Sequence, residues 1–170
     1  IRTNADLLNI DPNRIGISGN SAGGHLSLMA GLREQNPKFE GEAGNNEVNS
    51  SVKAVCAIYP PAQIRKYENT DPINDAYKTL MGVEAPQEEY DLASPLLQIR
   101  DDFPPTMLIH GSTDSVVNLS DTTDLYKILV DLNIPAELHI YSEEEHAFDS
   151  QSGYGRSVAD LQALFFQKYL

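Results

Sequence analysis

The chain has 170 residues, of which 41% are hydrophobic, and this is enough apolar material for one domain with a sizeable core. Twelve basic residues stand against 25 acidic ones, so the formal net charge is −13, which argues against a nucleic-acid backbone or an anionic membrane surface as a partner. No apolar stretch approaches the ~20 residues that span a bilayer. The single cysteine, Cys56, lies in an apolar run and is expected to pack as a small hydrophobic residue.

Residues 1–10 are expected to form the last turns of a helix, with Leu7, Leu8 and Ile10 on or near one face. The chain opens without an initiating methionine or a helix cap, so we expect it to begin inside an element, as a fragment or a processed product would. A cytoplasmic location is favoured because no signal-peptide pattern opens the chain, although a truncated start would also have removed one.

Four short apolar runs predict the strands of a sheet, and apolar residues at helical spacing predict helices between them. The last run alternates polar and apolar residues, which is typical of a half-exposed strand near a sheet edge. The alternation of strands and helices predicts an α/β fold over residues 1–170, with a parallel sheet between layers of helices. The expected strands are 15–18, 52–59, 105–111 and 136–141, and the expected helices follow residue 21 and cover 119–132 and 157–170.

Two segments interrupt this alternation. Residues 35–51 are rich in Gly, Asn and Glu without periodicity and are expected to form a surface loop. Residues 62–95 contain three prolines with short helical pieces around 76–81 and 88–92. Such a segment is either a cap or pocket wall or a plain connection between two strands.

A Gly-x-Ser-x-Gly pattern joins the first strand to the first helix, with Ser21 at its centre. Such a turn projects the serine hydroxyl above the sheet edge, and Gly19 and Gly23 are expected to lack side chains because the two arms pass close together. The following helix aims backbone N–H groups and a positive dipole end at the same place. The alternative is a chance Gly/Ser turn, but the flanking strand and helix favour a nucleophile.

A nucleophilic serine needs a base, and the base needs an acid that fixes its tautomer. Asp114 follows the third strand by three residues, in a loop at the same sheet edge as Ser21, and is the preferred acid. Asp121 and Asp124 are the rivals, but they lie at the start of a helix, where an acid commonly caps the helix or complements its dipole.

His146 is the preferred base, because it follows the fourth strand in another loop at that edge. His139 lies inside the strand and points from a sheet face. His110 ends the third strand and is expected to pack or to bond the backbone. His25 lies one helical turn beyond Ser21 and is expected to be structural.

Several segments resemble the carboxylesterase and lipase branch of the α/β-hydrolase fold, and most closely bacterial esterases of the hormone-sensitive-lipase-like and feruloyl- or acetylxylan-esterase-like types. Ser21, Asp114 and His146 also follow the chain order of that fold. The resemblance is carried by Gly-Asn-Ser-Ala-Gly-Gly-His-Leu after Asp-Pro-Asn-Arg-Ile-Gly-Ile, by Ala-Ser-Pro-Leu at 93–96, by Pro-Pro-Thr-Met-Leu-Ile-His-Gly-Ser-Thr-Asp at 104–114 and by His-Ala-Phe at 146–148.

The resemblance implies hydrolysis of small carboxylic esters, with short-chain acyl or aryl groups, without a metal or an organic cofactor. It also implies that Ser21 is the nucleophile, that His146 is the general base and then the acid, and that Asp114 orients His146. The backbone N–H of Ala22 would be one oxyanion donor. A peptidase or thioesterase on the same fold is compatible with the same residues.

The sequence departs from this family in two respects. The His-Gly-Gly-Gly-type loop that gives the second oxyanion donor is absent, and only the later four of about eight strands are expected, the C-terminal half of the fold. The alternative is therefore a poorly active or non-catalytic fragment that forms homo-oligomers or needs an N-terminal half.

Overall fold

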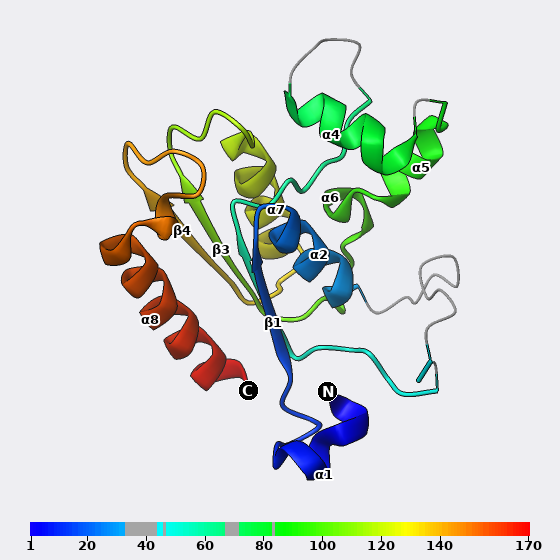
Figure 1. The fold of residues 1–170 in the computed structure, drawn as a ribbon, viewed down its shortest axis with the longest axis vertical. Coiled ribbons are helices and arrows are strands. Elements are labelled where there is room, and N and C mark those ends of the chain that lie inside the picture. Colours follow the sequence, from blue (N-terminus) through cyan, green and yellow to red (C-terminus); the bar gives the residue numbers. More distant parts are fainter. Residues whose placement is uncertain (33–43, 46, 67–71, 83) are drawn as a thin grey trace.

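The computed structural model describes residues 1–32, 44–45, 47–66, 72–82 and 84–170. Most of the loop expected at 35–51 lies outside these residues. Four strands form one parallel sheet, in the same order as in the chain (Figure 1). The strands are β1 (Gly16–Asn20), β2 (Ala54–Ile58), β3 (Thr106–Gly111) and β4 (Ala136–Tyr141). The expected parallel sheet is confirmed, and β4 is the expected partly exposed edge strand.

Helices connect the strands and cover both faces of the sheet. Such crossovers are what parallel pairing requires, because a parallel strand must start at the same end of the sheet as its predecessor. The helices are α2 (Ala22–Gly31) after β1, α4 (Pro72–Met81), α5 (Gln87–Leu92) and α6 (Pro95–Gln98) after β2, α7 (Leu119–Asp131) after β3, and α8 (Ser152–Tyr169) after β4.

The two cores follow from the side-chain alternation of the central strands. Val55 and Ala57 of β2 pack in the core beneath α2 and α7, together with Leu28, Leu108, Leu125 and Leu129. The intervening residues of β2 pack on the opposite face beneath α8, in a core that also holds Met107, Ile109, Val158 and Phe165. Both central strands are buried along their whole length, as expected of strands covered on two faces.

The strand register brings the carboxyl ends of the strands to one edge. Asn20 at the end of β1 pairs with Ile58 at the end of β2, and Gly111 at the end of β3 pairs with Tyr141 at the end of β4. Residues that directly follow these strands therefore emerge side by side, although they are far apart in the sequence.

Three of the differences from the sequence predictions concern β1, α8 and α6. β1 continues to Asn20, so the strand reaches the residue before Ser21. α8 begins at Ser152, five residues before the predicted start at residue 157. The third difference is α6, which begins at Pro95 and was not predicted. Proline lacks only a donor that the first helical turn leaves unused, and its fixed φ suits that turn, so here it starts a helix.

The N-terminal segment is helical, as predicted, but in two short pieces, a 3-10 turn over Arg2–Asn4 and α1 (Ala5–Leu8). Cys56 is a free, fully buried thiol in the core beneath α8, and burial raises its pKa to about 12 despite a hydrogen bond with Ser18. Its predicted packing is confirmed. Among the described residues, no helix combines the length and apolar character that crossing a membrane requires.

Candidate functional site

Ser21 occupies the turn between β1 and α2 in a strained conformation. Its backbone has φ 53° and ψ −121°, a region that side-chain-bearing residues rarely adopt and that surrounding contacts must enforce. One such contact is the Ser21 N–H, which donates to the Ile58 carbonyl at 2.9 Å. The end of β2 thus holds the backbone of Ser21 in place.

The turn is tight because strand and helix approach each other at glycines. A Cβ on Gly19 would lie 2.3 Å from the Gly23 carbonyl oxygen, so only glycine fits there. The expectation for Gly23 is wrong, since a Cβ on Gly23 would meet nothing within 4 Å. The second close approach is at Gly24, where a Cβ would lie 3.0 Å from the Ile58 carbonyl oxygen. The helix therefore contacts the ends of both β1 and β2.

The structure brings Ser21, His146 and Asp114 together in one hydrogen-bonded path. His146 Nδ1 lies 2.7 Å from Asp114 Oδ2, and His146 Nε2 lies 3.0 Å from Ser21 Oγ. A carboxylate only accepts, so Nδ1 carries the proton and Nε2 is free to accept the Ser21 hydroxyl. This tautomer is the one in which an imidazole can take a proton from the serine.

Asp114 is fixed by the loop that follows β3. Its Oδ1 accepts the backbone N–H groups of Val116 and Val117, at 2.9 and 2.8 Å. Burial by itself would raise the pKa of Asp114, but hydrogen bonds from His110, Val117, His146 and Val116 outweigh it and lower the pKa to about 2. Asp114 is therefore an anion at neutral pH, and its two oxygens face different partners.

His110 is a partner of Asp114 that the sequence analysis missed. It is fully buried, and its Nε2 lies 3.2 Å from both Asp114 Oδ2 and the Val117 carbonyl oxygen. Both are acceptors, so Nε2 carries the proton and donates, while Nδ1 lies 2.7 Å from Thr122 Oγ1 on α7. The predicted bond from His110 to the backbone is confirmed by its contact with Val117. Its contact with Asp114 was not predicted, although Asp114 follows His110 by only four residues.

The loops that carry Asp114 and His146 are joined directly. Ser115 donates its N–H and its hydroxyl to Glu145 Oε2, at 3.0 and 2.9 Å. Thr113 N–H donates to the Glu144 carbonyl at 3.1 Å. A Cβ on Gly111 would lie 2.3 Å from that carbonyl oxygen, so glycine is required where the loops meet. These contacts fix the distance between the acid and the imidazole.

Asp121 and Asp124, the alternatives to Asp114, have partners or exposure that differ from those of Asp114. Asp121 does not cap α7, because the Asn118 side chain does so by accepting the Ser120 N–H. Asp121 instead binds Arg65 at 2.6 Å with its side chain 2% exposed, and accepts the Gln63 N–H. Asp124 is exposed on α7.

The side chains of the other two histidines contact groups other than Ser21. His25 is buried, with Nε2 2.8 Å from the Ala93 carbonyl oxygen, which confirms its structural placement. Burial lowers the pKa of His25, and the bond to Ala93 opposes this in part. His139 lies in β4 with Nε2 3.7 Å from Glu137 Oε2.

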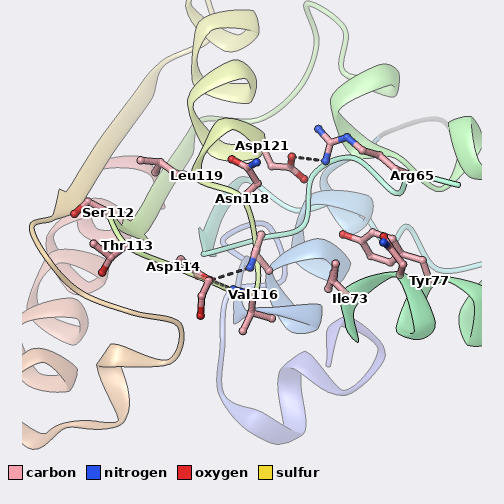
Figure 2. A pocket seen from close by; sticks show the side chains of 13 residues that line it. Arg65, Ile73, Tyr77, Ser112, Thr113, Asp114, Val116, Asn118, Leu119 and Asp121 are labelled. Carbon is pink, nitrogen blue, oxygen red and sulfur yellow. Dashed lines mark hydrogen bonds and ion pairs between the residues drawn. The ribbon is translucent and has the colours of Figure 1, made fainter. Parts of the chain in front are cut away.

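A cavity of about 530 Å³ adjoins the Asp114 loop and α4. Figure 2 shows Ile73 and Tyr77 of α4 across the cavity from Asp114 and Val116, with the Arg65–Asp121 ion pair in its wall. Residues between β2 and β3 thus line one side of it. In the described part of the chain, no three or more His, Cys, Asp or Glu residues lie together so that they could hold a metal ion.

Comparison with known proteins identifies the family. The sequence profile of the BD-FAE family matches residues 1–129. The chain belongs to the BD-FAE family. This BD-FAE chain is 31% identical over 147 residues to the probable carboxylic ester hydrolase LipM of Mycobacterium tuberculosis, a match that covers 82% of the chain and 33% of LipM. The chain spans about a third of the length of the curated relatives it matches.

Solved structures agree with the fold. The acetyl ester-xyloside bifunctional hydrolase of Caldicellulosiruptor lactoaceticus superposes with a TM-score of 0.81 at 27% identity, covering 98% of this BD-FAE chain and 61% of that protein. A truncated carbohydrate esterase from gut microbiota gives 0.79 at 27% identity, covering 98% and 64%. The predicted relationship to α/β-hydrolase esterases, over part of their length, is confirmed.

Proposed function

We propose that this chain carries the catalytic residues of a carboxylic ester hydrolase. The observation that carries the proposal is the path from Ser21 Oγ to His146 Nε2 at 3.0 Å and from His146 Nδ1 to Asp114 Oδ2 at 2.7 Å. Each bond has the length and the donor direction that removal of the serine proton requires. The relationship to carboxylic ester hydrolases supports the same reaction.

The proposed reaction has two steps, acylation of Ser21 by the ester and hydrolysis of the acyl-serine. Ser21 Oγ attacks the ester carbonyl carbon while its proton passes to His146 Nε2, and the negative charge of Asp114 stabilises the imidazolium. The bond to the alcohol oxygen then breaks, and His146 returns the proton to that oxygen, which leaves an acyl-serine. A water molecule gives its proton to His146, attacks the acyl carbon and releases the acid, and the proton returns to Ser21.

The N-terminus of α2 is the proposed site of oxyanion stabilisation. Ala22 is the first residue of α2, and the first intrahelical bond, from His25 N–H to the Ser21 carbonyl at 3.1 Å, leaves the Ala22 N–H without a helical acceptor. That N–H and the helix dipole favour negative charge next to Ser21 Oγ. A second donor is proposed to come from the additional length that the relatives have.

The cavity beside Asp114 is the proposed binding site for part of the substrate, with α4 as its wall. The two solved neighbours are described as an acetyl ester-xyloside hydrolase and a carbohydrate esterase, which supports a short acyl group as the proposed substrate moiety. A preference for p-nitrophenyl acetate over p-nitrophenyl octanoate would bear this out, and the reverse preference would exclude it.

Hydrolysis of p-nitrophenyl acetate tests the proposal. Ser21→Ala is expected to lower kcat by about 10³-fold or more, because the nucleophile is lost. Ser18→Ala is the matched control, since Ser18 lies in β1 and its hydroxyl bonds Gln162 of α8 and the buried Cys56 thiol. Equal rates for Ser21→Ala and Ser18→Ala would rule out this function.

A further inference from the structure

Tyr59 stands out at the same sheet edge, outside the path from Ser21 to Asp114. It directly follows β2, is 1% exposed and has a φ of 37°. A positive φ is unfavourable for a large side chain, so the surroundings must hold Tyr59 in this conformation. Its backbone N–H donates to the Ile109 carbonyl at 2.6 Å, which ties it to β3. Such strain suggests that the position of the ring matters.

Two side chains hold the Tyr59 hydroxyl, Asn20 at the end of β1 and Asp149 in a 3-10 turn over Phe148–Ser150. It donates to Asp149 Oδ1 at 2.5 Å and accepts from Asn20 Nδ2 at 3.0 Å. Asn20 Nδ2 also lies 3.5 Å from Asp149 Oδ2, which closes a triangle of three groups. Burial raises the pKa of Tyr59, and its bond to Asp149 raises the pKa further, so the hydroxyl remains a donor at any ordinary pH.

This triangle links the residues that flank the reacting groups. Asn20 precedes Ser21 in the chain, and Asp149 follows His146 by three residues. The Tyr59 ring lies against the His146 imidazole, with ring centroids 4.5 Å apart and planes inclined by 57°. The centroids of the Tyr59 and Phe148 rings lie 5.9 Å apart, with their planes inclined by 68°. The Tyr59 ring thus contacts both His146 and the core residue Phe148, and its hydroxyl is fixed to the end of β1 and to the segment after His146.

We propose that Tyr59 is a positioning residue that holds the His146 imidazole in line with Ser21 Oγ, with Asn20 and Asp149 as its anchors. The inference rests on the proposed function, because it concerns the same proton transfer. Proton transfer depends steeply on geometry, since a group displaced by about 1 Å can lose up to about 10²-fold in rate. Tyr59 itself exchanges no proton with the substrate.

The test compares kcat and KM for p-nitrophenyl acetate among variants of the protein at its full natural length. Tyr59→Phe keeps the ring but releases it from both anchors, and Asp149→Ala removes one anchor. Each is expected to lower kcat about 3- to 10-fold with KM within about twofold, because alignment and not binding is affected. Asp149→Asn keeps an oxygen that accepts the Tyr59 hydroxyl and is expected to restore most of kcat.

A double variant separates positioning from general loosening. Tyr59→Phe with Asp149→Ala is expected to be no slower than Tyr59→Phe alone, because loss of the tyrosine hydroxyl already breaks the bond to Asp149. Tyr141→Phe is the matched control: its hydroxyl lies 2.8 Å from Ser157 Oγ in the same aromatic cluster, and its ring contacts Phe148. It is expected to leave kcat unchanged.

The outcomes distinguish this inference from the proposed function. If the unmodified protein hydrolyses the ester through Ser21 but Tyr59→Phe and Asp149→Ala match Tyr141→Phe, the inference is overturned and the function stands. Additive losses, or losses in KM alone, also overturn it. If the unmodified protein is inactive, both fail. If Tyr59→Phe does not fold, the Asp149→Ala and Asp149→Asn pair decides the question in the same way.

Discussion

His110 and His146 both lie within hydrogen-bonding distance of the same oxygen of Asp114, Oδ2, at 3.2 and 2.7 Å. His146 lies at the site surface with its side chain 17% exposed, whereas His110 is completely buried. The buried imidazole supplies a fixed donor that anchors the carboxylate, and Thr122 on α7 fixes that donor in turn. The orientation of the acid therefore depends on a helix that packs behind it.

Replacing His110 should disturb the acid without touching Ser21. His110→Leu removes the donor and is expected to lower kcat by about 10-fold or more, because Asp114 is held less firmly. His110→Gln keeps an N–H group near the position of Nε2 and should retain more of kcat. Steady-state kinetics on p-nitrophenyl acetate measures both variants, and a leucine variant as active as the glutamine variant would contradict this role.

Asp114 and Asp121 can be separated by the matched substitutions Asp114→Asn and Asp121→Asn. The first is expected to reduce kcat by about 10³- to 10⁴-fold, because the imidazole tautomer is no longer fixed. The second breaks the ion pair with Arg65 and should lower the free energy of unfolding by about 2 kcal/mol or more, with kcat per folded molecule nearly unchanged. Urea unfolding and active-site titration give the two quantities. A large loss of kcat in Asp121→Asn without one in Asp114→Asn would contradict the choice of Asp114 as the acid.

The lowered pKa of Asp114 predicts how stability changes with pH. The pKa is about 2 in the folded chain and 3.8 ordinarily, so the ionised carboxylate stabilises the folded state above about pH 4. This contribution is lost as the pH falls through about 2. The difference in free energy of unfolding between the unmodified chain and Asp114→Asn should therefore shrink over this interval in urea titrations. A difference that grows towards pH 2 would mean that the pKa is not lowered.

The contact between the two loops predicts that Gly111 cannot be replaced. Gly111→Ala would force a Cβ to within 2.3 Å of the Glu144 carbonyl oxygen, so the loops must separate. We expect a loss of about 1–3 kcal/mol in stability together with a lower kcat. Gly153→Ala, at the start of α8 with nothing within 4 Å of the new Cβ, is the control. Equal thermal stability of the two variants would show that the loops can separate without cost.

Cys56 is predicted to be unreactive in the folded chain. Its thiol is fully buried, and burial raises its pKa to about 12, so the reactive thiolate is scarce and shielded. Iodoacetamide at pH 8 should leave the folded protein unmodified and should alkylate it in 6 M guanidinium chloride. Mass spectrometry counts the adducts, and rapid alkylation without denaturant would contradict the buried packing.

The sequence predicts best what depends on local pattern. Short apolar runs predict the strands that end at Gly111 and Tyr141, and they predict β1 although its end lies at Asn20 and not at Ser18. The residues that follow these strands share one edge because the strands are parallel. The role of His110 was not predictable in the same way, because its contacts depend on where α7 packs. The structure of the residues between β2 and β3 was the hardest to predict, because Pro72 and Pro95 begin α4 and α6 and do not end helices.

Packing across the sheet also explains the remaining corrections. Gly24, and not Gly23, lies close to the Ile58 carbonyl, because α2 packs against the end of β2 as well as against β1. Asp121 binds Arg65 from the β2–α4 connection, which no pattern within α7 could indicate. The catalytic roles of Ser21, His146 and Asp114 remain predictions that their geometry supports.

The most direct test is the site of covalent modification by a fluorophosphonate, read by mass spectrometry of the digested protein. An activated serine attacks phosphorus and keeps the adduct, whereas an ordinary serine does not react. We expect one adduct, on Ser21, whose formation is lost in Ser21→Ala and greatly slowed in His146→Ala, while Ser18→Ala reacts normally. Absence of an adduct on Ser21, or unchanged labelling of His146→Ala, would contradict the account.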